Sequence, residues 1–186
     1  EISACLVGSE MCIRDSLNDK FVIIYHGAFS FKRGIIETVD SIAFLGGEYR
    51  KVVLFLLGSG PALPNLKRLI QKKGIQDRVV IHRPVDYKDV PEYVAMCDVG
   101  IAPLPDIPDW RNQCPLNLLE YLAMRKVVIV TDIPANREIV GKSKCGIYVS
   151  SADPREIAKA IMYAYDNTQV LKEWGFCGRA IVEEKY

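Results

Sequence analysis

The sequence has almost no excess of charge of either sign, because 24 Lys and Arg residues face 23 Asp and Glu residues and leave a net charge of +1. Proteins that bind nucleic acid or anionic membranes without specificity usually carry a larger basic excess, so we expect no nucleic-acid partner. Long hydrophobic runs are also missing: none approaches the 18 residues of a membrane span. The start, Glu1–Leu6, has neither a basic segment nor a long apolar one, so no secretory signal is expected.

Metal-ligating patterns are equally scarce. The six cysteines form no CxxC pair and the chain has only two histidines, so the spacing of a zinc site is absent. A chain of this length can bury a sizeable core without disulfides. We therefore interpret Cys97, Cys145 and Cys177 as small core residues of a protein in a reducing, cytoplasmic compartment.

Residues 1–16 differ in pattern from the rest of the chain. The stretch CLVGSEMCIRDS has no helical or strand period. It resembles a peptide that recurs where sequencing-adapter read-through has been translated, which predicts a non-native segment outside the fold. The alternative is a disordered N-terminal arm. Under either interpretation Cys5 and Cys12 have no functional role.

From Phe21 onward, short apolar runs alternate with amphipathic stretches. The predicted strands are Phe21–His26, Val52–Leu57, Val79–His82, Asp98–Leu104, Val127–Thr131 and Gly146–Val149. The predicted helices are Gly34–Leu45, Leu63–Lys73, Lys88–Met96, Leu116–Met124, Ala135–Val140, Pro154–Tyr165 and one from Gln169, and residues 105–114 are predicted as a loop. This alternation indicates βαβ units with a buried parallel sheet. We expect one α/β domain over 18–186, with a Rossmann-like, doubly wound, six-stranded parallel sheet in the order 3-2-1-4-5-6.

Ligands of such sheets bind beyond the carboxyl ends of the strands, so the residues after each strand are the candidates. The first strand ends in HGAFSFKRG, where Gly27 permits close backbone approach and Arg33 stands at a helix start. This pairing suits a phosphate, although Arg33 could equally be a solvated loop residue. The turn after the second strand, GSGP, is neither a dinucleotide fingerprint nor a Walker loop, and Pro61 is expected to open the next helix.

A second candidate site lies at the start of the predicted helix 116–124. Pro115 suits the first helical position, and the N–H groups of Leu116, Asn117 and Leu118 are expected to be free for an anion. Glu120 falls about 40° from Leu116 on the helix, beside the apolar face, and a carboxylate there needs a partner. A ribose diol or a neighbouring Arg or Lys would serve.

The histidines and tryptophans give weaker indications of function. With two histidines and no close acid, a Ser-His-Asp triad is not expected, and His82 is interpreted as a half-buried strand residue. Trp110 and Trp174 stay unassigned, because a loop aromatic can stack on a base but more often packs.

Taken in order and spacing, several segments resemble the C-terminal, nucleotide-sugar donor-binding domain of GT-B glycosyltransferases of the group-1, family-4 type. The resemblance covers about residues 18–186. The segments that carry it are GAFSFKRGI, LLGSGP, DRVVIHRPV, CDVGIAPL and CPLNLLEYLAMRKVVIVTDIPANREIV.

The resemblance implies roles for individual residues. Arg33 matches the lysine of the family's diphosphate clamp, whereas the arginine of that clamp falls on Ala28. Glu120 matches the second member of the E-x7-E pair, the ribose ligand, and Asn112 falls on the first, which helps to hold the donor sugar. The other implied contacts are Gly27, Pro115, Leu116, Asn117 and Leu118 for the diphosphate and Arg83, Pro84 and Val85 for the base.

Several of these positions depart from the family pattern. Asn117 stands where lysine is usual, and Arg125-Lys126-Val127-Val128 replaces a G-K-P-V turn.

The activity that the resemblance implies is transfer of a sugar from a nucleoside diphosphate to an acceptor, with retention and without metal or other cofactor. Much of the catalytic apparatus would lie on an N-terminal GT-B domain that this chain does not contain. The chain also resembles one that ends before the family's final helix. We therefore expect no catalytic residue within the chain and no activity of the chain alone. Any contact with the inner face of a membrane would be made by the absent half.

Two alternatives to this interpretation exist. The substitutions at Ala28, Asn112 and Asn117 leave open a degenerate GT-B domain that serves as a non-catalytic partner or scaffold module. A GT-B sugar epimerase shares the fold, but its histidine-bearing motifs are not found.

Overall fold

The computed structural model describes residues 16–186, and its centre is a six-stranded parallel sheet in the order β3-β2-β1-β4-β5-β6. The strands are β1 (Phe21–Ala28), β2 (Val52–Ser59), β3 (Val79–His82), β4 (Val99–Ala102), β5 (Val127–Thr131) and β6 (Gly146–Val149). This confirms the predicted fold class and strand order. Both strands at the edges of the sheet, β3 and β6, are only four residues long.

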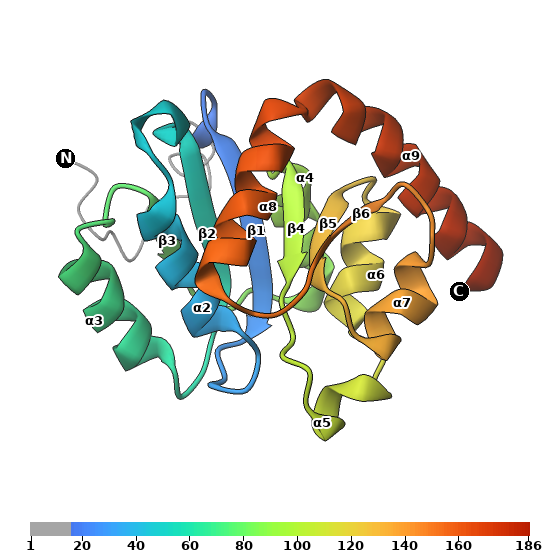
Figure 1. The fold of residues 1–186 in the computed structure, drawn as a ribbon, viewed down its shortest axis with the longest axis horizontal. Helices are drawn as coiled ribbons and strands as arrows, with labels where there is room; N and C mark the ends of the chain where they lie inside the picture. Colours follow the sequence, from blue (N-terminus) through green and yellow to red (C-terminus); the bar gives the residue numbers. More distant parts are fainter. Residues whose placement is uncertain (1–15) are drawn as a thin grey trace.

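Helices cover both faces of the sheet (Figure 1). They are α2 (Ile35–Ser41), α3 (Leu63–Lys73), α4 (Val90–Ala95), α5 (Pro108–Arg111), α6 (Leu116–Ala123), α7 (Pro134–Val140), α8 (Pro154–Asp166) and α9 (Thr168–Lys185), with short 3-10 turns η1 (Ile42–Phe44), η2 (Gly47–Tyr49) and η3 (Tyr87–Asp89). The long α9 crosses the molecule beside α6 and α8 (Figure 1).

The core consists of two hydrophobic layers that share the sheet. Alternate residues of β1 divide between them, since Ile23 faces the layer under α2, α3 and α8, while Ile24 faces the layer under α4, α6 and α7. Strands buried on both faces explain why the sequence shows continuous apolar runs instead of alternation.

Three local predictions were wrong. The predicted loop 105–114 contains the short helix α5, which Pro108 opens and whose last residue, Arg111, pairs through Nε with Asp106 Oδ1 at 2.7 Å. Pro61 lies in the turn before α3, which begins at Leu63. Cys177 is exposed on α9, whereas Cys97 and Cys145 are buried as expected.

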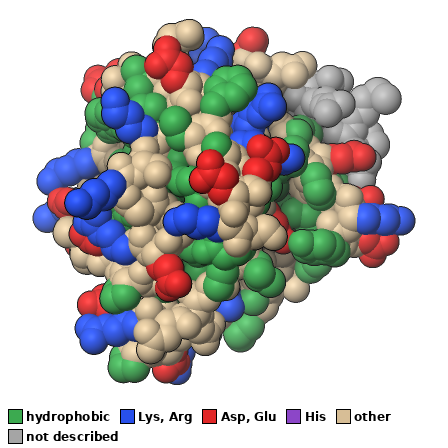
Figure 2. Space-filling model, turned by 90° about the vertical axis from the view of Figure 1, so that its right-hand side faces the viewer, with side chains coloured by type: hydrophobic (Ala, Val, Ile, Leu, Met, Phe, Trp, Pro, Cys, Tyr) green, Lys and Arg blue, Asp and Glu red, His purple; other side chains and the backbone are tan. Residues whose placement is uncertain are grey.

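The predicted non-native segment lies outside the described residues except for Ser16, and so do Cys5 and Cys12. None of the helices within residues 16–186 combines the length and the hydropathy of a membrane span. The face that carries the C-terminal end of the chain shows acidic and basic side chains interspersed with hydrophobic ones (Figure 2).

Candidate functional site

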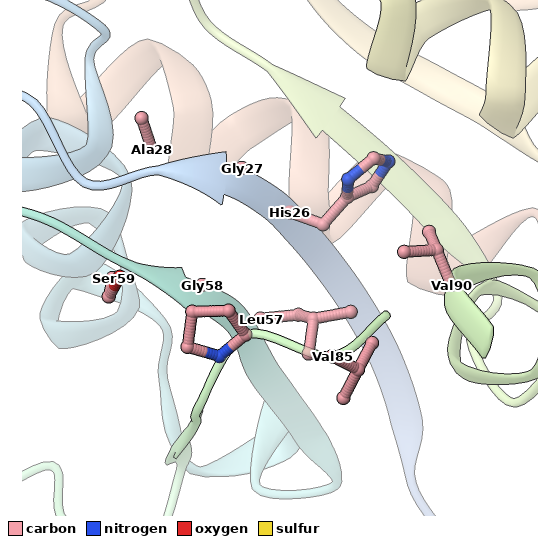
Figure 3. Close-up of a pocket in the computed structure, with 9 residues that line it drawn as sticks. His26, Gly27, Ala28, Leu57, Gly58, Ser59, Val85 and Val90 are labelled. Carbon is pink, nitrogen blue, oxygen red and sulfur yellow. The ribbon is translucent and has the colours of Figure 1, made fainter. Parts of the chain in front are cut away.

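A groove of about 320 Å³ opens at the carboxyl ends of β1 and β2, where an open α/β sheet is expected to bind its ligand (Figure 3). Its lining residues come from the ends of both strands, from the segment after β3 and from the start of α4: His26, Gly27, Ala28, Leu57, Gly58, Ser59, Pro84, Val85 and Val90. The volume lies within the range of small-molecule pockets.

Two glycines allow the strand ends to approach closely beside this groove. Gly58 has a φ of +150°, and a Cβ there would collide with the carbonyl oxygen of Gly27. Gly27 has a φ of +126° and open space where its Cβ would be, so the groove meets bare backbone at this point. The glycine proposed for the diphosphate therefore lies in the groove lining.

The loop after β1 is fixed to the turn after β2. The N–H of Phe29 donates to the carbonyl oxygen of Ser59 at 2.8 Å, and the carbonyl oxygen of Phe29 accepts from the N–H of Ala62 at 2.9 Å. Phe29 itself is fully buried. The carboxyl end of β1 is thus a rigid part of the site.

Helix α6 is hydrogen-bonded to the carboxyl end of β1 at His26, the half-buried residue that follows the buried part of the strand. The Tyr121 hydroxyl accepts a hydrogen bond from the His26 N–H (2.9 Å), and the Asn117 Nδ2 donates to the His26 carbonyl oxygen (3.4 Å). The imidazole Nε2 lies 2.8 Å from the Glu120 Oε2. Asn117, Glu120 and Tyr121 have the i, i+3, i+4 spacing that places side chains on one helix face.

Close packing of α6 on the sheet depends on Gly100 in β4. A Cβ at Gly100 would collide with the ring of Tyr121. The Tyr121 side chain is fully buried, and this burial raises its pKa well above the ordinary value. The Tyr121 hydroxyl therefore stays protonated and stays at the His26 backbone.

Glu120 is an ionised carboxylate held by two neighbours. A hydrogen bond from His26, with a smaller one from Tyr87, lowers the pKa of Glu120 below its usual value, although burial opposes this. The protein partners of Glu120 are therefore not the Arg or Lys of the predicted alternative, and its role as a ribose ligand stays a prediction. The expectation that neither histidine has an acid close to it was also wrong, since Glu120 contacts His26. The sequence did not reveal this contact because the two residues become neighbours only in the folded chain.

The apolar face of α6 differs from the one predicted. Leu116 is 69% exposed and does not mark this face, which consists of Leu118, Tyr121 and Leu122. Glu120 nevertheless lies beside the face, and its side chain is 21% exposed.

Arg33 stands near the site but outside the groove lining. Its guanidinium lies 4.7 Å from the ring centre of Trp110 and interacts with the Tyr25 hydroxyl, whose pKa burial raises to about 12. The Trp110 Nε1 donates to the Lys32 carbonyl oxygen at 2.6 Å, and Lys32 pairs with Asp109 at 3.1 Å. Trp110, unassigned from the sequence, thus fastens α5 to the loop after β1.

The N-terminus of α6 offers fewer free donors than predicted. Pro115 occupies the N-cap with extended backbone, and the Leu118 N–H donates to its carbonyl oxygen at 2.9 Å. Among the residues that the structure describes, the N–H groups of Leu116 and Asn117 then have no backbone acceptor.

Only some of the residues that were predicted to bind the base and the donor sugar line the groove. Pro84 and Val85 line the groove, whereas Arg83 and Asn112 lie outside its lining. His82 is half-buried, as predicted, and stacks on Phe55. Within residues 16–186 no cluster of His, Cys, Asp and Glu side chains could hold a metal ion. The metal-independence of the reaction stays a prediction.

A doubly wound parallel sheet with its groove at the carboxyl ends of β1 and β2 defines a Rossmann-like domain of the kind that makes up half of a GT-B fold. Residues 13–180 match the family "Glycosyl transferases group 1", and the chain belongs to that family.

Two curated relatives are bacterial sugar transferases. The chain is 23% identical over 162 residues to alpha-D-kanosaminyltransferase of Streptomyces kanamyceticus, covering 87% of this chain and 41% of the relative. It is 26% identical over 137 residues to D-inositol 3-phosphate glycosyltransferase of Xylanimonas cellulosilytica, covering 73% of this chain and 32% of the relative. The chain therefore spans less than half the length of these relatives.

Solved structures share the fold. The Anabaena protein HepE in complex with UDP and glucose matches with a TM-score of 0.82 at 18% identity, over 96% of this chain and 47% of that one. The C-terminal domain of the group 1 glycosyl transferase LpcC from Francisella tularensis matches with a TM-score of 0.77 at 15% identity, over 98% of this chain and 96% of that one.

Proposed function

We propose that this chain is the donor-binding half of a glycosyltransferase that moves a sugar from a nucleoside-diphosphate sugar to an acceptor. The observation that carries the proposal is the groove at the carboxyl ends of β1 and β2, with the ionised Glu120 held beside it by His26. HepE, a structural neighbour, was crystallised with UDP and glucose, which is consistent with such a donor.

The groove offers complementary surfaces to the parts of a nucleotide. Pro84 and Val85 form an apolar wall for the base, and Gly27 presents backbone for the diphosphate. The carboxylate of Glu120 can accept hydrogen bonds from both hydroxyls of a ribose. We expect Arg33 to exchange its stacking on Trp110 for the diphosphate, because a phosphate offers a guanidinium two charge-assisted hydrogen bonds.

The chemical step would be electrostatic. Arg33 and the free N–H groups at the start of α6 would stabilise the charge that develops on the departing diphosphate. Asn117 in place of a lysine makes this stabilisation weaker. Four further parts of the proposal rest on the family resemblance alone. They are retention of configuration, independence of metal, a cytoplasmic location and an acceptor domain outside this chain.

The test is a calorimetric titration of the chain with UDP, GDP and ADP, each with and without magnesium. We expect one nucleotide to bind saturably and independently of magnesium. Glu120→Ala should weaken binding by roughly 10- to 100-fold, the range for hydrogen bonds to a charged group. Glu173→Ala on the exposed surface of α9 is the matched control and should not change affinity.

The result that would overturn the proposal is equally definite. If the folded chain binds none of the three nucleotides, the donor role fails. The non-catalytic module, favoured by Ala28, Asn112 and Asn117, would then be the better interpretation.

A further inference from the structure

We propose that His26 is a positioning residue that holds the Glu120 carboxylate in the orientation in which it accepts the ribose hydroxyls. The inference rests on the proposed function and extends it to a residue that has no assigned role. It starts from the 2.8 Å contact between the imidazole Nε2 and the Glu120 Oε2.

The contact matters because neither atom has an alternative partner. Both are shielded from solvent, and neither makes another hydrogen bond within residues 16–186. The contact is bent away from a linear hydrogen bond, and its strength comes from the charge of the carboxylate. A proton on Nε2 lets the imidazole interact favourably with the carboxylate, although the bent geometry makes this weaker than a linear hydrogen bond.

The imidazole is itself immobilised. The backbone N–H and carbonyl groups of His26 are bonded to Tyr121 and Asn117, and its ring packs edge-on against the Tyr121 ring with 5.0 Å between centres. The ring thus ties the position of Glu120 on α6 to that of β1. A bound ligand then meets a carboxylate that is already oriented, and preorganisation of this kind lowers the entropic cost of binding.

Only one of the two carboxylate oxygens is engaged by the imidazole. The Tyr87 hydroxyl, from the exposed turn after β3, also lies near Glu120 and helps to lower the pKa of its carboxyl. Tyr87 is 76% exposed, so a ligand can displace it at small cost, whereas His26 is held by its backbone and its ring. We therefore expect His26 to stay bonded when a ribose binds and Tyr87 to be exchanged.

The experiment measures the coupling between His26 and the ribose hydroxyl. The affinities of UDP and 2′-deoxy-UDP, or of the GDP or ADP pair if that base binds, are compared in wild type, His26→Leu and His26→Gln. Glutamine places an amide donor near the position of Nε2 and is the conservative variant. His82→Leu replaces the other histidine and is the matched control.

In wild type we expect the ribonucleotide to bind roughly tenfold or more tightly than its 2′-deoxy analogue. In His26→Leu this ratio should fall by about fivefold or more, while His26→Gln and His82→Leu should keep it within about twofold. A merely structural role of His26 would weaken both ligands equally and leave the ratio unchanged, and that result would overturn the inference.

A measurement without ligand separates this inference from the donor role. The carboxyl of Glu120, followed by NMR in the free protein, should titrate at a higher pH in His26→Leu than in wild type, with His26→Gln in between. An unchanged titration would refute the positioning role even if nucleotides bind. Failure of every nucleotide to bind wild type would instead refute the proposed function and, with it, the ribose role of the pair.

Discussion

Tyr121→Phe removes a single oxygen atom from the junction between α6 and β1. That oxygen accepts a hydrogen bond from the N–H of His26 at 2.9 Å, and the Tyr121 ring that carries the oxygen is fully buried. Because the ring remains and only the oxygen is lost, the variant leaves no large cavity. It isolates the contribution of this hydrogen bond to stability.

The magnitude depends on the fate of the His26 N–H. A donor that loses its acceptor against a fully buried ring costs about 1–3 kcal/mol where water reaches it poorly, and the His26 bond is partly buried. For a chain of this length, each kcal/mol lowers the melting temperature by roughly 2–4 °C. We expect Tyr121→Phe to lose about 2 kcal/mol, measured by urea denaturation, and roughly 4–8 °C, measured by calorimetry.

Hydrogen exchange locates the effect. The amide of His26 should exchange faster in Tyr121→Phe by a larger factor than the amides of its neighbours in β1, since only its acceptor is gone. Tyr163→Phe on α8 is the control: its side chain is 44% exposed, and we expect a stability change within about 0.5 kcal/mol. If Tyr121→Phe matched Tyr163→Phe in stability, the hydroxyl would not be the acceptor that holds β1 to α6.

Three further outcomes can be measured on the same protein. Arg125 has a φ of +59°, so Arg125→Gly should be more stable than Arg125→Ala by about 1 kcal/mol in urea denaturation; equal stabilities would show that the backbone there is not strained. Gly58→Ala should lose more than about 2 kcal/mol or fail to fold, as circular dichroism would reveal, because its Cβ would collide with the Gly27 carbonyl; a native melting curve would contradict this. The pKa of the Asp132 carboxyl is lowered by hydrogen bonds from Arg137 (2.6 and 2.7 Å), so the pair stabilises the fold above the ordinary aspartate pKa and loses this effect as the pH falls through the lowered folded-state pKa. The difference in melting temperature between wild type and Asp132→Asn should therefore shrink as the pH falls below the ordinary aspartate pKa, and a difference that stays constant over that range would argue against the ion pair.

The fold was predictable because its signals are local. Continuous apolar runs such as Val52–Leu57 predict strands covered on both faces, and the helical stretches between them force parallel pairing. The exception is α5, where four residues are too few to show a helical period and the structure depends on the contact of Trp110 with Lys32, 78 positions earlier.

The site was only partly predictable. Gly27, Pro84 and Val85 come directly after or near strand ends, and the topology alone brings them to one groove. The contact between His26 and Glu120 joins residues far apart in the sequence, and it requires knowledge of how α6 is rotated over β1. The sequence did contain a signal for this contact: His26 ends a predicted central strand, and Glu120 lies one turn inside a helix that follows a neighbouring strand. The signal was obscured because the apolar face of the helix was set from Leu116, which is exposed.

The short outer strands β3 and β6 have a consequence for self-association. A long, unpaired strand edge is a template on which a second chain can add a strand, and that reaction leads to aggregates. Here each outer edge offers only four residues of backbone. The domain thus limits sheet-to-sheet polymerisation by geometry, independently of the nearly balanced charge that contributes little repulsion between molecules.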